Sequence, residues 1–194
     1  MEWYAPPIVL DPELLRPERV RPLKRAEYDR LVEAGVFEDE KVELLRGMLV
    51  TMSPQGVPHF FPIEELTERL VLALTGRARV RVQGPLAATD DSEPEPDIAV
   101  VEPVERRREH PSTALLVVEV AVSSVRKDME VKAAIYAEAS VVEYWVIDVS
   151  REKVVRFLEP RGGVYSEVSE HGRGEGLALR AFPDVEIALD AILP

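Results

Sequence analysis

The segment 114–120 reads Ala-Leu-Leu-Val-Val-Glu-Val, and Glu119 is its one polar residue. The apolar residues do not alternate with polar ones, which is typical of a central strand covered on both faces. Segment 129–139 has a helical pattern, and segment 141–149 (Val-Val-Glu-Tyr-Trp-Val-Ile-Asp-Val) is a second buried strand. This run of buried strand, helix and buried strand indicates an α/β fold.

Three further elements lie upstream of these strands. Segment 58–75 places its apolar residues on one helical stripe and is followed by Gly76. Segment 77–82, Arg-Ala-Arg-Val-Arg-Val, alternates like a strand, and 98–101 is a short apolar strand. The order helix, three strands, helix, strand from 58 to 149 predicts a mixed sheet with a helix on each face.

The two ends of the chain predict smaller additions to this sheet. Residues 1–22 contain five prolines and are interpreted as a proline-rich arm, followed by a short helix over 23–34. Segment 42–51 predicts a hairpin that turns at Arg46 and Gly47. Strands 153–158 and 164–168 predict a C-terminal hairpin across 160–163. We therefore expect an arm over 1–22 and a single domain over 23–194.

Composition excludes several classes of protein. The chain has 194 residues, of which 36 are acidic and 24 basic, for a net charge of −12, and it contains no cysteine. The absence of cysteine excludes thiol nucleophiles, iron–sulfur clusters and cysteine zinc sites. The net charge disfavours a general nucleic-acid coat protein, because like charges repel. No window reaches the ~18 apolar residues of a membrane helix, so a cytoplasmic protein without membrane contact is expected.

Two acidic residues adjoin the apolar strands. Glu119 interrupts the most apolar strand, and Asp97 directly precedes 98–101. If the two strands pair, these carboxylates converge and suit Mg²⁺ or Mn²⁺, with Lys132 on the next helix near the metal. The alternative is structural: Asp97 ends a strand, Glu119 pairs with an arginine and Lys132 is solvated. Spacing alone leaves both readings open.

Runs spread over most of the chain together resemble one known family. They are 42–49, 52–54, His59, 96–101, 116–120 with Ser123 and Ser124, Asp128, Lys132, Tyr136 and 143–148. Their order and spacing over residues 23–192 resemble the Uma-type family of bacterial restriction endonucleases, in the PD-(D/E)XK nuclease superfamily. The resemblance implies a restriction-endonuclease-like fold, here with an added N-terminal hairpin and a C-terminal β-hairpin.

The resemblance also implies roles for individual residues. Asp97 and Glu119 are expected to ligate a divalent metal, with Glu43 as the family's extra acidic residue and third ligand. The superfamily motif places a lysine two residues after Glu119, where this chain has Ala121. Lys132 matches the position to which the family's lysine has moved. His59, at the start of a helix, is a candidate for contacting a phosphate or metal-bound water. Structural roles for Glu43 and His59 stay open.

Basic residues near the predicted site are candidates for holding a nucleic-acid backbone. Arg77, Arg79 and Arg81 share one face of the predicted strand, and Arg126 and Lys127 precede the helix of Lys132. Arginines at 106–108 lie in another loop that we expect to flank the site. The alternative is that these are surface residues paired with the surplus of carboxylates.

Two functions follow. The first is a Mg²⁺- or Mn²⁺-dependent endonuclease acting on nucleic acid, with DNA implied by the family. The second is a catalytically inactive nuclease-fold module that binds nucleic acid or a protein partner. Many nucleases of the superfamily are dimers, since the two strands of a duplex require two sites related by a two-fold axis, so a homo-oligomer is expected.

Overall fold

The computed structural model describes residues 16, 18–52, 56–104 and 109–194. Most of the predicted arm and the arginines at 106–108 lie outside these residues. The helical segments are α1 (Arg25–Glu33), α2 (Val57–Leu74), the π-helical turn η2 (Lys127–Lys132), α3 (Ala133–Glu138) and the 3-10 turn η3 (Leu189–Ala191). The strands are β1 (Val42–Leu45), β2 (Met48–Thr51), β3 (Arg79–Val82), β4 (Ile98–Val101), β5 (Leu116–Ala121), β6 (Glu143–Asp148), β7 (Lys153–Arg161), β8 (Val164–His171), β9 (Gly176–Ala178) and β10 (Glu186–Ala188).

The core of the fold is a six-stranded mixed sheet in the order β3-β4-β5-β6-β7-β8. Only β5 and β6 pair in parallel, with Glu119 opposite Val146, and the other neighbours are antiparallel. A parallel pair needs a crossover connection, which η2 and α3 supply. The predicted mixed α/β sheet flanked by helices is therefore confirmed.

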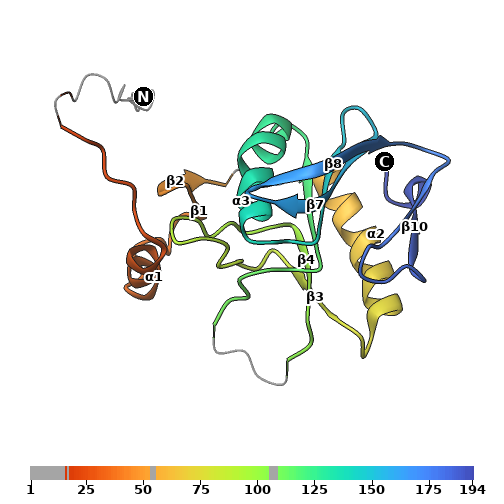
Figure 1. Cartoon of the computed structure of the whole chain (residues 1–194), viewed down its shortest axis with the longest axis horizontal. Coiled ribbons are helices and arrows are strands. Elements are labelled where there is room, and N and C mark those ends of the chain that lie inside the picture. Colours follow the sequence, from red (N-terminus) through yellow and green to blue (C-terminus); the bar gives the residue numbers. More distant parts are fainter. Residues whose placement is uncertain (1–15, 17, 53–55, 105–108) are drawn as a thin grey trace.

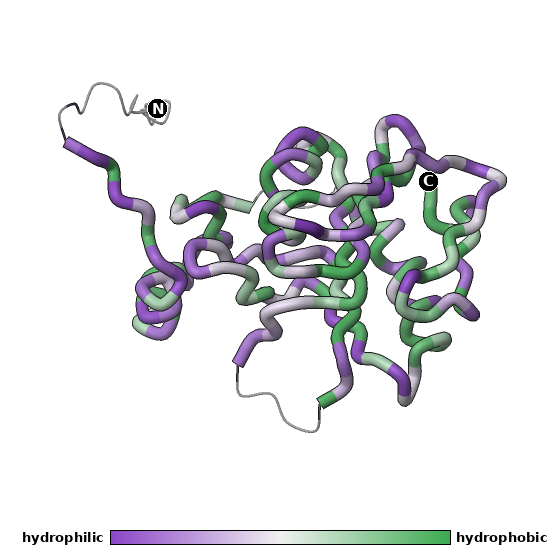
Figure 2. The backbone as a smooth tube through the Cα atoms, viewed as in Figure 1, coloured by the Kyte–Doolittle hydropathy of each residue, from purple (hydrophilic) through white to green (hydrophobic). Residues whose placement is uncertain are grey.

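Each face of the sheet buries its own hydrophobic cluster. Ile98, Val118 and Trp145 point to one face and pack with α2 and the C-terminal segment. Ala99 and Val117 point to the opposite face and pack with α3. Figure 2 shows hydrophobic residues following the central strands, while the connecting segments are more polar. Both faces are buried, which explains why the central strands lack alternation in sequence.

The N-terminal part attaches to the sheet through one loop. α1 and the hairpin β1–β2 lie at one end of the molecule and β10 at the other (Figure 1). Leu44 of β1 exchanges two backbone hydrogen bonds with Glu93, in the segment leading to β4. The predicted turn at Arg46 and Gly47 is confirmed, and both residues have positive φ. A Cβ on Gly47 would lie 2.3 Å from the Cβ of Pro22, so this turn requires glycine.

Several predicted boundaries differ from those of the structure. The strand predicted over 77–82 begins at Arg79, because Arg77 lies in the turn after α2 and its N–H donates to the Leu74 carbonyl. The helix predicted over 129–139 starts earlier, and its first part is the π-helical turn η2. Strands β7 and β8 extend further than the predicted 153–158 and 164–168. None of the described helices combines the length and the hydropathy required to cross a membrane.

Candidate active site

A cavity of about 290 Å³ lies where the ends of β4 and β5 approach η2 and the first turn of α2. Five carboxylate side chains, two lysines and one histidine contribute to its wall. The lining residues are Glu43, Thr51, Met52, Gly56, Pro58, His59, Glu95, Asp97, Glu119, Val120, Val122, Ser123, Ser124, Lys127, Asp128 and Lys132. Every residue predicted to be catalytic or metal-binding therefore borders one cavity.

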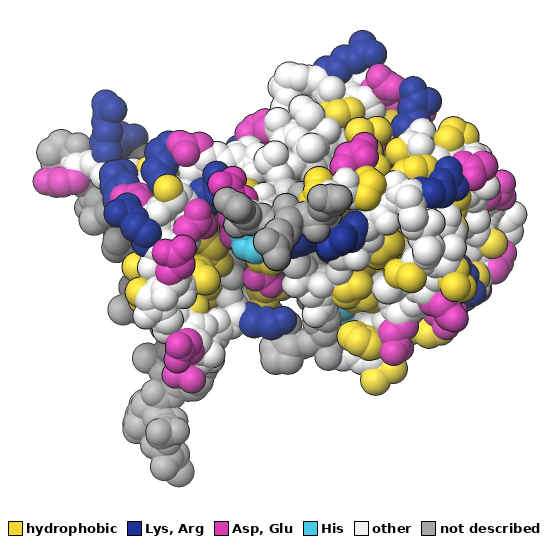
Figure 3. Space-filling model, turned by 90° about the horizontal axis from the view of Figure 1, so that it is seen from below, with side chains coloured by type: hydrophobic (Ala, Val, Ile, Leu, Met, Phe, Trp, Pro, Cys, Tyr) yellow, Lys and Arg dark blue, Asp and Glu magenta, His cyan; other side chains and the backbone are white. Residues whose placement is uncertain are grey.

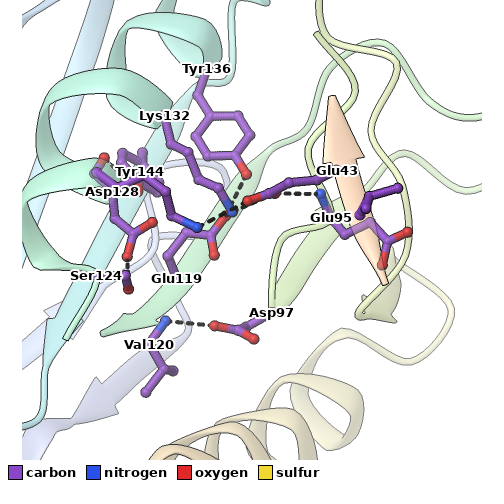
Figure 4. Close-up of polar contacts among 12 residues, drawn as sticks. Glu43, Glu95, Asp97, Glu119, Val120, Ser124, Asp128, Lys132, Tyr136 and Tyr144 are labelled. Atoms are coloured by element: carbon purple, nitrogen blue, oxygen red, sulfur yellow. Dashed lines mark hydrogen bonds and ion pairs between the residues drawn. The ribbon is translucent and has the colours of Figure 1, made fainter. Parts of the chain in front are cut away.

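Asp97 and Glu119 come from neighbouring strands of the sheet. Asp97 precedes β4, and its Oδ2 accepts a hydrogen bond of 2.8 Å from the backbone N–H of Val120 in β5. This bond fixes the Asp97 carboxylate beside Glu119 (Figure 4). Glu119 points to the same face of the sheet as Val117, toward α3, and is only 4% exposed. The pairing of β4 with β5 therefore fixes the positions of the two acids relative to each other.

The helix that follows β5 holds one oxygen of Glu119. Lys132 Nζ and the Tyr136 hydroxyl both donate to Glu119 Oε1, at 2.9 and 2.6 Å. Among the described residues, every hydrogen bond to this carboxylate ends on Oε1. The Tyr136 ring packs in the core, 4.9 Å from the ring of Tyr144. Its hydroxyl nevertheless belongs to the site.

Glu43 lies between two lysines. Its Oε2 is 2.9 Å from Lys132 Nζ and its Oε1 is 3.0 Å from Lys127 Nζ, and the Glu95 N–H also donates to Oε2 at 3.3 Å. The Glu43 side chain is completely buried. Both of its oxygens are thus occupied by protein cations, so these contacts favour a role in holding lysines over the predicted role of third metal ligand.

His59 and Asp128 complete the polar wall. His59, in the first turn of α2, places Nε2 at 3.4 Å from Asp97 Oδ2. Asp128 accepts a short hydrogen bond from the Ser124 hydroxyl, and its backbone carbonyl accepts one from Tyr144. Asp128 therefore orients the start of the helix that carries Lys132.

Sequence reasoning missed Glu95 as a member of the site. The signal was present in Glu93-Pro94-Glu95-Pro96-Asp97, because alternate residues of an extended segment face the same way. Glu95 and Asp97 do border the same cavity, whereas Glu93 borders a separate one below α1.

The cavity contains more carboxylate side chains than lysines. Burial, opposed by Lys132 and assisted by Asp97, raises the pKa of Glu119 to about 8. Burial also raises the pKa values of Asp97 and Asp128. Glu43 is also buried, but the ammonium groups of Lys132 and Lys127 lower its pKa. Burial disfavours the charged form of Lys132, yet the carboxylates around it raise its pKa. Lys132 and Lys127 together outweigh the effect of burial on the pKa of Glu43, whereas Lys132 does not outweigh it for Glu119.

Ala121 explains why the lysine does not occupy the usual motif position. It is fully buried in the cluster that packs under α3, together with Ala133 and Tyr144. A lysine side chain at position 121 would have no room there. Lys132 instead reaches Glu119 from the helix.

The predicted backbone-binding residues are dispersed. Lys127 lines the cavity, whereas Arg126 is 88% exposed and pairs with Glu130. Arg77 forms a two-pronged ion pair with Asp184 and stacks on Phe182. Arg79 is exposed on the edge strand β3, and Arg81 donates to the Pro85 carbonyl and lines the separate cavity below α1. Figure 3 shows lysines and arginines scattered among acidic residues over the face it draws.

The donor set of the cavity fits a divalent cation. Within the described residues, no three His, Asp or Glu side chains form a ready metal-binding cluster. Mg²⁺ does not require one, because proteins commonly hold it through one or two carboxylates, with water and phosphate oxygens as the other ligands. Asp97 and Glu119 are two such carboxylates, and a cation would stabilise their ionised forms, which burial disfavours.

The six-stranded mixed sheet with its flanking helices defines an α/β protein with a restriction-endonuclease-like fold. Residues 25–190 match the Uma2 family, whose description is "Putative restriction endonuclease", and the chain belongs to this family. The family resemblance inferred from sequence is thus confirmed. No curated protein sequence matches the chain.

Solved structures support the fold. A "putative nuclease belonging to DUF820" from Anabaena variabilis superposes with a TM-score of 0.69 at 15% identity, over 88% of this chain and 97% of that one. The type IIG restriction endonuclease BpuSI aligns with a TM-score of 0.40 at 20% identity, over 61% of this chain and 14% of its own length. At 15% identity the first match is evidence for the fold alone. The TM-score of the second match is too low to support a shared fold.

Proposed function

We propose that this protein is a divalent-metal-dependent endonuclease that hydrolyses phosphodiester bonds of nucleic acid, with DNA as the substrate that its family favours. One observation carries the proposal: Asp97 and Glu119 border a single cavity, and Lys132 binds one oxygen of Glu119. Membership of a family described as restriction endonucleases supports the reaction class.

Asp97 and Glu119 would hold Mg²⁺ or Mn²⁺. A divalent ion bound there polarises a phosphoryl group and lowers the pKa of water, which supplies a nucleophile near neutral pH. Five carboxylates face two lysines in the cavity, so without added positive charge the site repels a phosphodiester. Metal dependence is therefore expected for binding as well as for hydrolysis.

The protein's own residues have separable roles. Lys132 keeps its proton beside Glu119 and stabilises negative charge that develops on the phosphoryl group. His59 lies against Asp97 and orients that carboxylate. Glu43 holds Lys132 in place. Tyr136 directs Glu119 by binding Oε1.

The test is Mn²⁺ binding by calorimetry combined with Mg²⁺-dependent cleavage of plasmid DNA. Asp97→Asn should lower Mn²⁺ affinity at least about tenfold and abolish cleavage. Asp148→Asn is the matched control, because Asp148 is also buried at a strand end but binds Ser150 and Arg151 and does not line the cavity. The proposal would be contradicted if both variants lost Mn²⁺ affinity and cleavage to the same extent, or if the folded wild type bound no Mn²⁺.

A second function is favoured by one contact. The ion pair between Lys132 and Glu119 partly compensates the buried acid without any metal. A catalytically inactive module that binds nucleic acid or a protein partner would keep this pair permanently. In that case DNA binding would persist in EDTA, and Mn²⁺ would change neither binding nor thermal stability.

An active nuclease of this size would act on duplex DNA as a homo-oligomer. The two strands of a duplex run in opposite directions, so two copies related by a two-fold axis present one site to each. Light scattering on the DNA-bound protein tests this part, since a strict monomer that cuts both strands would contradict it.

A further inference from the structure

The π-helical turn η2 determines where two lysines point. In an α-helix residues rotate by about 100° each, so side chains five apart lie on different faces, about 140° from one another. In η2 the Ala133 N–H donates to the Asp128 carbonyl, five residues back. This wider turn brings residues five apart closer to the same face. Lys127 and Lys132 lie five positions apart in the sequence, so this wider turn acts on their relative direction.

Both lysines consequently reach the same carboxylate. Lys127 Nζ contacts one oxygen of Glu43 and Lys132 Nζ contacts the other, at 3.0 and 2.9 Å. Figure 4 shows Lys132 reaching between Glu119 and Glu43. With α-helical geometry the two ammonium groups would diverge, so this arrangement depends on η2.

The two lysines differ in burial and in the number of their partners. The Lys132 side chain is 3% exposed and binds both Glu43 and Glu119. The Lys127 side chain is 34% exposed, and among the residues that the structure describes it has one ion pair, with Glu43 at the cavity wall. The Lys127 end of this pair reaches solvent, so its ammonium group can leave Glu43 for water or for another anion. Glu43 would still have Lys132 and the Glu95 N–H.

We propose that Lys127 is a substrate-binding residue whose ammonium group moves from Glu43 to a phosphate oxygen of the nucleic acid, while Lys132 stays in place. Glu43 is then a positioning residue for both lysines. This inference rests on the proposed function, because it assumes a phosphodiester in the cavity. Glu43 keeps Lys132 and the Glu95 N–H after this exchange, so its buried carboxylate is not left without a partner.

The experiment measures binding of a fluorescent DNA duplex in Ca²⁺ at several salt concentrations. Lys127→Met should lower affinity about tenfold and reduce the slope of log affinity against log salt by about one unit. Lys127→Arg should restore the slope, since a guanidinium group also binds phosphate. Lys24→Met is the matched control: Lys24 likewise forms an exposed ion pair, with Asp90, but does not line the cavity.

A separate measurement tests the role of Glu43. Glu43→Gln removes the carboxylate that Lys127 must leave, so duplex binding should be at least as tight as in the wild type, and Mn²⁺ affinity should stay within about threefold because Glu43 is not a metal ligand in this scheme. Should Glu43→Gln lose Mn²⁺ as strongly as Asp97→Asn, Glu43 is a ligand and the inference fails.

The outcomes separate this inference from the nuclease proposal. Equal slopes for Lys127→Met and Lys24→Met, in a protein that still cleaves DNA, would overturn the inference alone. A wild-type protein that binds no duplex would overturn both.

Discussion

Tyr136→Phe is the most informative single change at the site. It removes the hydroxyl that donates to Glu119 Oε1 at 2.6 Å and leaves the ring, which packs at 4.9 Å from Tyr144. The core keeps its volume, so no cavity term is expected. What is lost is one hydrogen bond to a carboxyl group that is buried and has a pKa of about 8.

The size of the effect depends on the charge of Glu119. A hydrogen bond to a neutral partner contributes about 0.5–1.5 kcal/mol and one to a charged partner about 1.5–3 kcal/mol. Loss of the hydroxyl therefore penalises ionised Glu119 by about 1–1.5 kcal/mol more than protonated Glu119, which raises its pKa by about one unit. Because metal binds the ionised form, Mn²⁺ affinity at neutral pH should fall about tenfold.

The assay is Mn²⁺ calorimetry at pH values on both sides of 8, together with chemical unfolding. Half-maximal binding should move to higher pH by about one unit, and metal-free stability at neutral pH should fall by only about 1 kcal/mol. Tyr165→Phe is the control, because its hydroxyl donates to the Val141 carbonyl and its ring stacks on Tyr144. An unchanged Mn²⁺ profile, or the same shift in Tyr165→Phe, would refute the assignment of Tyr136 to the site.

Three further outcomes are expected. Because the folded-state pKa of Glu119 is raised from 4.5 to about 8, the folded chain holds an extra proton between these values; metal-free stability should therefore fall as pH rises through this range, and thermal melts with saturating Mn²⁺ should show less of this fall. Lys132→Met should cost about 3–5 kcal/mol in urea unfolding because it leaves Glu43 and Glu119 short of a cation; adding Glu119→Gln should recover part of this, and no recovery would argue against the pair. Ala121→Lys combined with Lys132→Met should lower the melting temperature and not restore cleavage, since position 121 is fully buried; restored cleavage would contradict the relocated lysine.

Much of the fold follows from local patterns in the sequence. The unbroken apolar run around Val117 and Val118 predicted a strand buried on both faces, because each face contacts its own cluster of side chains. The turn at Gly47 was predictable because few residues other than glycine accept its backbone conformation. The start of β3 was not, because the turn that includes Arg77 depends on how α2 ends.

The acids of the site were easier to predict than their partners. Glu119 stands out because a carboxylate in an apolar strand is costly without a partner. The hydroxyl of Tyr136 and the convergence of Lys127 and Lys132 on Glu43 were not predictable, because both depend on tertiary packing. A π-helical turn has no strong signature in sequence, and this one forms where Tyr144 binds the Asp128 carbonyl.

The two central acids of the site are carried by the sheet, and its two lysines are carried by a helical turn. Asp97 and Glu119 are carried by adjoining strands in the middle of the sheet, where any displacement would break backbone pairing. The positive groups of the site belong to a helix that lies above that sheet. Spacing between the acids is therefore as rigid as the sheet, whereas the amines can be adjusted by a change in the winding of one turn. An engineer could alter the arrangement of the lysines without touching the strands that carry Asp97 and Glu119.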